Sequence, residues 1–195
     1  PFAVGRESDG AWQAVSLTQL WTNYAGGDVS VGEMAEIVRK AAARAGAAYE
    51  LPYDRFHPRP AAGTAGSLLV GVPHVSGVTP LSADGLSECL VELRRQALEM
   101  YTLLAGNAPE FAGIEFGPFG GLPGVRESRR IVGDYVISKD DLLCGRRHED
   151  GLFTVEQNMD FHRRASGEPA IVVERTTPYQ VPYRVMLPPN VDGLL

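Results

Sequence analysis

The sequence predicts an α+β fold in which helices pack on a mixed or antiparallel sheet. Two clear helical patterns and several strand-like segments are interspersed along the 195 residues, but they do not alternate as a parallel α/β fold requires. Hydrophobic residues make up 44% of the chain and charged residues 22%, the ordinary balance of a globular domain. A chain of this length can bury a substantial core, and no internal repeat divides it.

The first third of the chain predicts a strand followed by a helix. Apolar residues alternate with small or polar ones over 11–21, as in a half-buried strand, and the Gly-Gly-Asp at 26–28 ends that pattern. Ser30 and Glu33 have the spacing of a capping box, in which each side chain binds the other residue's backbone amide. Gly46 is expected to end the helix. The apolar stripe of this helix consists of Met34, Ile37, Val38, Ala41 and Ala45.

The middle of the chain predicts a second, longer helix. Residues 51–66 are rich in Pro, Gly and Ala and are expected to form a loop, whereas 67–72 predict a short apolar strand. Helical periodicity follows over 82–105, and the helix is expected to end at 106–107 because Pro109 prevents it from resuming. The expected apolar stripe consists of Leu86, Leu90, Leu93, Ala97, Met100, Tyr101 and Leu104.

The last third contains a glycine-rich segment and several strand-like pieces. Residues 113–124 are expected either to form a surface loop or to let the backbone come close to another group. Residues 126–136 indicate a polar entry into a strand. Ser138–Asp141 resembles a helix start, and Gly145 is expected to end that helix. Further strands are predicted over 153–155, 171–174 and 181–185.

The composition argues against several classes of partner. The formal net charge is -6 and the pI is about 5.2, whereas nucleic-acid binding needs clustered Lys and Arg. Cys89 and Cys144 form neither a disulfide framework nor a zinc motif, and Cys89 is expected to act as a small hydrophobic residue in the core. A reducing cytoplasm is the expected location. No apolar run has the length of a membrane span, so no membrane partner is expected.

The densest polar cluster in the sequence is an Arg-Glu-Ser-Arg-Arg run directly after the glycine-rich segment. In an extended strand, Arg126, Ser128 and Arg130 would share one face. Glu127 and Arg129 would share the other. The first face could offer two guanidinium groups to a carboxylate, a phosphate or a flavin carbonyl. The alternative is a salt-bridged strand edge, with partners among Asp134, Asp140 and Asp141.

Asp160 and His162 are candidates for acid–base catalysis. They lie two residues apart, so in an extended segment they share one face, where the carboxylate could orient the imidazole. A pair on the surface without a catalytic role is the alternative. No metal site is expected, because the four histidines are scattered without the paired spacing of metal ligands. These histidines are His57, His74, His148 and His162.

Three stretches resemble a bacterial family of FAD-dependent oxidoreductases. The most specific is Gly-Val-Arg-Glu-Ser-Arg-Arg-Ile-Val-Gly from residue 124, which is similar to that family's G-[VI]-R-E-[ST]-R-R-I-x-G motif. Residues 1–7 resemble the segment that leads away from a flavin-contacting strand. Residues 181–195 resemble the segment that leads back into the FAD-binding fold. Residues 24–80 match poorly, and substrate specificity is expected to vary there.

The resemblance implies that residues 1–195 are the substrate-side domain of a two-domain flavoprotein. FAD would then be the cofactor and would carry the hydride chemistry. The sequence has no G-x-G-x-x-G fingerprint, so 1–10 and 186–195 are expected to be stubs leading from and into an FAD-binding domain outside it. The implied partners are a small-molecule substrate and the remainder of that FAD-binding domain. Association into a homo-oligomer is left open.

The resemblance also implies roles for particular residues. Arg126 and Arg130 are expected to be the cations that face the flavin or the substrate, and Glu127 is expected to hold an arginine in place. Tyr183 and Arg184 are expected to line the same pocket from the other side.

Two other functions are compatible with the residues alone. One is a binding or scaffold subunit that docks to a partner without catalysis. The other is a cofactor-free hydrolase or isomerase in which Asp160 and His162 form the catalytic dyad. The latter would be active without flavin and would lose its activity when His162 is replaced.

Overall fold

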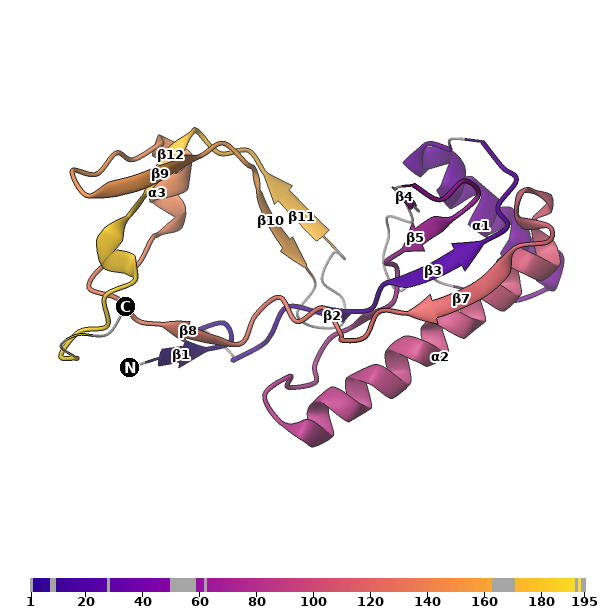
Figure 1. Ribbon diagram of the computed structural model, residues 1–195, viewed down its shortest axis with the longest axis horizontal. Coiled ribbons are helices and arrows are strands. Elements are labelled where there is room, and N and C mark those ends of the chain that lie inside the picture. The colour runs from indigo at the N-terminus through magenta and orange to yellow at the C-terminus, as the bar shows by residue number, and fades with distance from the viewer. Residues whose placement is uncertain are drawn as a thin grey trace.

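A computed structural model of the chain describes residues 2–7, 10–27, 29–49, 59–61, 63–162, 171–191 and 193. Figure 1 shows two lobes that are joined by two ribbons of paired strands. We call the larger one the helical lobe and the smaller one the hairpin lobe. Every strand pair of the described residues is antiparallel, and helices accompany the sheets. The predicted α+β class is therefore confirmed.

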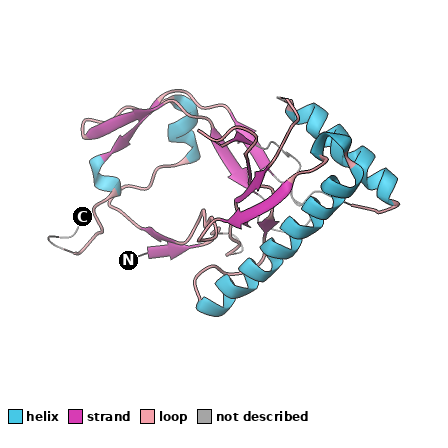
Figure 2. Cartoon of the chain, turned by 45° about the vertical axis from the view of Figure 1, so that its right-hand side comes forward, coloured by secondary structure: helices cyan, strands magenta, loops and turns pink. Residues whose placement is uncertain are grey.

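The helical lobe packs two helices against a small antiparallel sheet (Figure 2). Its elements are β2 (Val15–Ser16), β3 (Gln19–Thr22), α1 (Val31–Ala45), β4 (Arg59–Pro60), β5 (Leu68–Val70), β6 (His74–Val75), α2 (Ala83–Asn107), the 3-10 helix η1 (Pro109–Phe111) and β7 (Glu115–Phe119). The sheet has the order β4-β5-β3-β7, and β2 pairs separately with β6. Burial alternates along β5, where Leu68 and Val70 are buried and Leu69 is exposed, so one face of the sheet meets the core.

The helices begin where their caps predict. The Ser30–Glu33 capping box is formed, and Gly46 ends α1 in the left-handed conformation with φ 64°. Ser82 caps α2, and α2 ends at Asn107, within the expected 106–107. The Asn107 side chain donates to the Leu103 carbonyl at 3.0 Å, which stabilises the last turn. The α2 residues that are buried are Gly85, Cys89, Leu93, Ala97, Met100, Leu103 and Leu104, so the stripe was predicted only in part.

One strand prediction in this lobe was wrong, and one of the two alternatives for the glycine-rich segment is observed. Residues 11–21 do not form one strand, because β2 and β3 pair with different partners: β2 with β6, and β3 with β5 and β7. The glycine-rich segment contains strand β7. At Gly117 a Cβ atom would lie 2.5 Å from the Leu20 carbonyl oxygen, so the glycine allows the close approach of β7 to β3. The second alternative for this segment, a close backbone approach, is the one observed.

The hairpin lobe contains α3 (Lys139–Cys144), β9 (Gly151–Val155), β12 (Tyr179–Pro182) and the 3-10 helix η2 (Tyr183–Val185). The ribbons are β1 (Phe2–Val4) with β8 (Arg129–Ile131), and β10 (Met159–His162) with β11 (Ile171–Glu174). The strand expected over 181–185 ends at Pro182, which has no N–H to continue the ladder. The Tyr183 carbonyl then accepts from Met186 N at 3.0 Å in a 3-10 turn.

The short helix α3 agrees with its predicted signals. Ser138 and Asp141 form a capping box, and Gly145 ends the helix with φ 67°. The predicted loop over 51–66 lies largely outside the described residues, which resume at 59. Within the described part of the chain, no helix combines the length and the apolar character needed to cross a bilayer.

Candidate functional site

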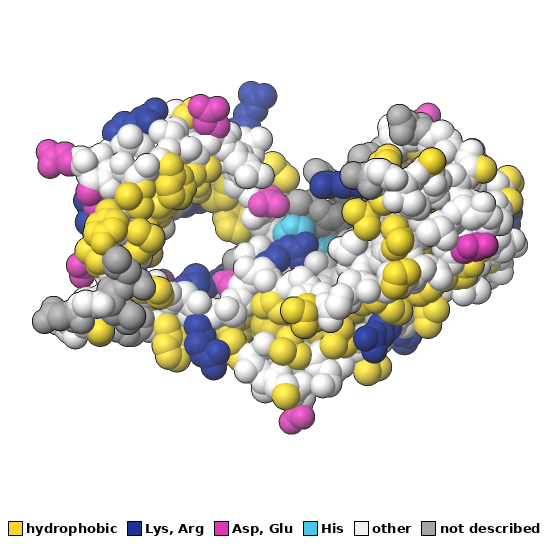
Figure 3. All heavy atoms as spheres, viewed as in Figure 1, with side chains coloured by type: hydrophobic (Ala, Val, Ile, Leu, Met, Phe, Trp, Pro, Cys, Tyr) yellow, Lys and Arg dark blue, Asp and Glu magenta, His cyan; other side chains and the backbone are white. Residues whose placement is uncertain are grey.

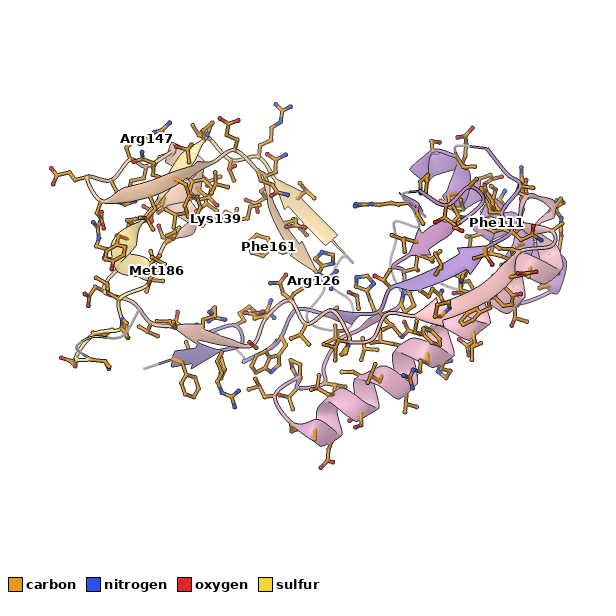
Figure 4. The ribbon with its side chains drawn as sticks, viewed as in Figure 1. Phe111, Arg126, Lys139, Arg147, Phe161 and Met186 are labelled. Carbon is orange, nitrogen blue, oxygen red and sulfur yellow. The ribbon has the colours of Figure 1, made fainter. Side chains whose placement is uncertain are left out.

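Five polar side chains meet where the β10–β11 ribbon approaches β2 and β6, near Arg126 in Figure 4. We call them the junction cluster: Gln13, His74, Arg126, Asp160 and His162. They come from four segments that are far apart in the sequence. In Figure 3 histidine side chains are visible in the hollow between the lobes, beside basic and acidic side chains. The sequence identified Arg126, Asp160 and His162 but gave no role to Gln13 or His74.

His74 and Arg126 are held by fixed hydrogen bonds. His74 Nδ1 lies 2.7 Å from the Val72 carbonyl oxygen, and because a carbonyl only accepts, Nδ1 carries the proton. In the neutral ring Nε2 is then an acceptor, and it lies 3.4 Å from a terminal nitrogen of Arg126. The other terminal nitrogen donates to the Ala14 carbonyl at 2.9 Å and to Ser16 Oγ at 3.0 Å. The Arg126 guanidinium is therefore oriented from two sides.

His162 lies flat against His74. Their ring centroids are 5.5 Å apart and the rings are nearly parallel, at 6°. The His162 amide donates to the Gln13 side-chain oxygen at 3.1 Å. Nε2 of His162 is 3.6 Å from Asp160 Oδ2, and the imidazole is 11% exposed whereas the carboxylate is 58% exposed. Asp160 and His162 therefore form the pair that their spacing predicted.

The environment of His162 favours its neutral form. Burial lowers the pKa of His162 below its ordinary value of 6.5, and the nearby charge of Arg126 lowers it further. Asp160 acts in the opposite direction, but its carboxylate is mostly in water and its effect is smaller. At pH 7 the imidazole is therefore uncharged and able to accept a proton.

Arg130 does not join Arg126 at one ligand face. Its guanidinium pairs with Glu127 Oε1 at 2.5 Å, and Glu127 Oε2 accepts from the backbone amide of Gln13 at 3.2 Å. The strand begins only at Arg129, so the alternation expected over 126–130 does not apply. Glu127 holds an arginine as predicted, and through Gln13 it also supports His162.

The alternative of a salt-bridged strand edge is observed in part, because Arg130 on β8 forms an ion pair, but with Glu127 and not with the downstream aspartates. Arg130 uses Glu127, which is local, and Arg129 lies over the ring of Phe2 at 5.6 Å. Asp141 pairs instead with Arg146 at 2.6 Å. Paired strands β1 and β8 place this run along a ribbon, where its members face different neighbours.

Tyr183 and Arg184 belong to a separate cluster in the hairpin lobe. They form η2, which Figure 1 draws at the left of the molecule, whereas β10 ends at its centre. Arg184 pairs with Asp150, contacts His148 Nδ1 at 3.0 Å and lies over the Tyr135 ring at 4.7 Å. The structure therefore does not bring Tyr183 and Arg184 to the junction cluster.

Asp141 links this second cluster to α3. Its side chain is 3% exposed, accepts from Tyr135 Oη at 2.8 Å and pairs with Arg146. Burial alone would raise the pKa of Asp141, but hydrogen bonds from Ser138 and Tyr135 and the charge of Arg146 bring it below its ordinary value. A carboxylate held in this way stabilises the lobe as an anion. Local sequence patterns indicate only the Ser138–Asp141 part of this cluster, because Arg184 lies 34 residues after Asp150.

A surface hollow in the helical lobe is a weaker candidate. It lies between 24–34 and 60–68, and its described lining consists mainly of backbone, small residues and apolar side chains without a charged group. A site for a polar ligand needs a few convergent polar groups. The junction cluster brings charged side chains together, whereas the polar side chains of this lining are the uncharged Tyr24, Thr64 and Ser67. Among the described residues, no three His, Cys, Asp or Glu gather as metal ligands.

Comparison with known protein families identifies the family to which the chain belongs. A family model described as FAD dependent oxidoreductase matches residues 1–195. The chain belongs to the FAD-dependent oxidoreductase family. No curated protein and no solved structure matches it. Membership of this family implies oxidoreductase chemistry that uses FAD.

The described helices of this FAD-dependent oxidoreductase chain do not fit the FAD pyrophosphate. Phosphates bind at helix N-termini, where free amides and the helix dipole favour negative charge. Here the first turns of α1, α2 and α3 carry Glu33, Asp84 and Asp140–Asp141, and Ser side chains already cap them. The junction cluster brings a positive charge, a neutral imidazole and an exposed carboxylate together, which are groups that suit a small polar ligand.

Proposed function

We propose that this chain is the substrate-binding portion of an FAD-dependent oxidoreductase, and that the junction cluster positions a small polar substrate for hydride transfer to or from the flavin. The observation that carries the proposal is the convergence of Arg126 with the Asp160–His162 pair of β10, which lies more than 30 residues further along the chain. An oriented cation, a neutral imidazole and a carboxylate within one cluster are the groups that alcohol or amine oxidation requires.

FAD, when bound, supplies the acceptor or donor of the hydride. The residues of the chain perform the accompanying proton transfer. His162 accepts the proton of a substrate hydroxyl or amine at Nε2, because its Nδ1 is buried. The O–H or N–H bond breaks, and an N–H bond forms on Nε2. Asp160, at 3.6 Å, stabilises the resulting imidazolium. In the reverse reaction the same imidazolium returns the proton.

Arg126 supplies the positive charge of the proposed site. Negative charge that develops on the substrate or on the flavin ring is stabilised by a guanidinium that is already oriented and needs no reorganisation. Arg130 and Glu127 act one step further away, because their ion pair supports the Gln13 backbone amide. Tyr183 and Arg184 keep a proposed role in substrate binding only if the hairpin lobe closes on the junction cluster.

The second part of the proposal concerns the FAD-binding remainder of the protein as the partner of this chain. The hairpin lobe and the β1–β8 ribbon expose large apolar side chains: Phe2, Ile131, Val136, Leu152 and Phe153, each between 47% and 65% exposed. Figure 3 shows hydrophobic side chains along the edge of the hairpin lobe that faces the opening. Apolar side chains gathered in this way are typical of a surface that another folded part covers.

The first test measures flavin retention. The purified chain is incubated with FAD, desalted and examined by visible absorption, alone and within the full-length protein. We expect retention in the full-length protein. In that protein Arg126→Ala should weaken turnover by about a hundredfold or more, because removing one oriented donor at a developing charge has a cost of this size.

The matched control is Arg39→Ala, which removes the same charge from an α1 side chain that is 68% exposed and pairs with Glu36. It should leave flavin retention and turnover within about twofold, as expected of a surface position. Activity in the colourless chain, lost in His162→Ala, would instead identify a cofactor-free hydrolase or isomerase. A full-length protein that neither retains FAD nor turns over a substrate would leave a binding or scaffold role.

A further inference from the structure

The histidine that received no role from the sequence is the most connected residue of the junction cluster. His74 is fixed on its own backbone side by two contacts. Its amide donates to Gln96 Oε1 on α2 at 2.9 Å, and its Nδ1–H donates to the Val72 carbonyl at 2.7 Å. Both contacts tie the ring to the helical lobe, whereas His162 and Asp160 belong to the β10–β11 ribbon. His74 therefore connects the helical lobe to the proposed acid–base pair.

One face of the His74 ring and its Nε2 atom both make contacts with the rest of the junction cluster. The flat face stacks on His162 with centroids 5.5 Å apart, and Nε2 faces the Arg126 guanidinium at 3.4 Å. The Val72 carbonyl fixes the proton on Nδ1, so Nε2 presents a lone pair to the cation. One ring therefore sets both the position of the catalytic imidazole and the orientation of the cation beside it.

We propose that His74 is the positioning residue of this site, a neutral imidazole that holds Arg126 against His162 and thereby keeps His162 unprotonated and ready to accept a proton. The inference deepens the proposed function and rests on it for the catalytic meaning of His162. It assigns to His74 no contact with substrate or flavin.

The charges around His162 support this direction. Its own strand contributes Asp160, which raises the pKa of His162, and the segment before β8 contributes Arg126, which lowers it. β6 contributes His74. Glu127 does not contact His162 directly: it accepts from the backbone amide of Gln13, whose side-chain oxygen accepts from the His162 amide. The paired strand β11 places Ile171 opposite His162 and Val173 opposite Asp160, so it adds no charge there. Burial is the largest cause of the lowered pKa of His162, and the charge of Arg126 adds to it in the same direction.

Replacements of His74 separate its two contacts. Phe keeps a flat ring for stacking but has no acceptor for Arg126. Gln lacks the ring but can place an oxygen near the position of Nε2. Asn reaches only the position of Nδ1 and serves as a second variant without the acceptor, should the Phe variant fail to fold. Arg126→Met removes the cation itself, and Arg129→Met is the charge-matched control.

The first measurement is the pKa of His162. It is obtained in the isolated chain from the NMR signals of the histidine rings as the pH is varied. We expect a pKa below 6.5 in the unmodified chain. In Arg126→Met, His74→Phe and His74→Asn it should rise by roughly half a pH unit or more, because the cation is lost or released. His74→Gln and Arg129→Met should stay close to the unmodified chain. An unchanged His162 pKa in folded His74→Phe and His74→Asn would overturn the inference.

The second measurement is the pH dependence of kcat/KM in the full-length protein. The acidic limb should move to higher pH in His74→Phe, and His74→Gln should restore it, which loss of packing alone would not produce. The NMR titration needs neither flavin nor turnover, so the two ideas fail separately. One outcome is that the pKa of His162 changes in the His74 and Arg126 variants, while the pH profile of kcat/KM is the same in His162→Gln as in the unmodified protein. This outcome would support the positioning role of His74 and contradict the proposed catalytic role of His162.

Discussion

At the scale of single residues, Gln19 is the least satisfied side chain of the core. It is 1% exposed on β3, and neither its amide nitrogen nor its amide oxygen has a hydrogen-bond partner among the described residues. Burying such a group without a partner costs about 1–3 kcal/mol. Gln19→Met has a similar shape and no such cost, so the free energy of unfolding in urea should rise by about 1 kcal/mol or more.

Gln180 is the matched control for Gln19. Its side-chain oxygen accepts from the His148 amide at 2.9 Å, so Gln180→Met removes a hydrogen bond that is made. This variant should be destabilised by about 1 kcal/mol. Equal effects of the two substitutions in the same direction would contradict the assignment of Gln19 as an unpaired residue.

The pH dependence of stability at His162 follows from the sign of its pKa change. In the unfolded chain His162 has its ordinary pKa of 6.5, whereas in the fold burial and Arg126 lower that pKa. As the pH falls through 6.5 the unfolded state binds a proton that the folded state does not, so stability decreases until the pH passes the folded pKa. Above pH 6.5 this contribution is constant.

The difference between the unmodified chain and His162→Gln isolates this contribution from those of the carboxylates. We expect the urea midpoint of the unmodified chain to decrease relative to that of His162→Gln between pH 7.5 and pH 5.5. A difference that stays constant over this range would show that the His162 pKa is the same in the folded and unfolded chain.

At the scale of elements, the contact of β7 with β3 depends on one glycine. A Cβ atom at Gly117 would lie 2.5 Å from the Leu20 carbonyl oxygen, in the part of the pair where the register shifts between Gln19 and Trp21. Gly117→Ala must therefore displace the two strands. We expect a loss of about 1–3 kcal/mol of unfolding free energy, the usual range for overpacking.

Gly121 provides the control for Gly117 four residues further along the same glycine-rich segment. No atom lies within 4 Å of the position of its Cβ, so Gly121→Ala should change stability by less than about 0.5 kcal/mol. Amide hydrogen exchange would locate the effect: faster exchange in β3 and β7 is expected for Gly117→Ala. Unchanged protection there would contradict the close contact.

The same elements show what the sequence could predict. The ends of α1 and α3 follow from capping boxes and from glycines that adopt positive φ, which are signals within a few residues. β7 could not be predicted in this way, because its strand conformation depends on β3, which lies about 95 residues earlier. For the same reason Asp160 and His162 were found from their spacing, whereas His74 and Gln13 join them only through the tertiary fold.

At the scale of the whole molecule, the proposed site depends on the ribbons that join the lobes. The junction cluster takes His74 from the helical lobe and His162 from the β10–β11 ribbon, so it exists only while the ribbon is docked. The hairpin lobe has its own polar network around Asp141 and Arg184, but its strand β9 exposes Leu152 and Phe153. Internal polar contacts therefore hold this lobe, and in the proposal above the FAD-binding remainder covers its apolar face.

A substitution at Phe153 tests whether the FAD-binding remainder covers this apolar face. Its side chain is 56% exposed in the chain, so Phe153→Ser should change the unfolding free energy of the isolated chain by less than about 0.5 kcal/mol and reduce the binding of an apolar dye. If the FAD-binding remainder packs on this face, the same change in the full-length protein buries a polar group and leaves a cavity, and stability should fall by about 3 kcal/mol or more. Val91 on α2 is 70% exposed in the helical lobe, so Val91→Ser should affect neither protein appreciably. An equally small effect of Phe153→Ser in both proteins would show that the FAD-binding remainder does not cover this part of the hairpin lobe.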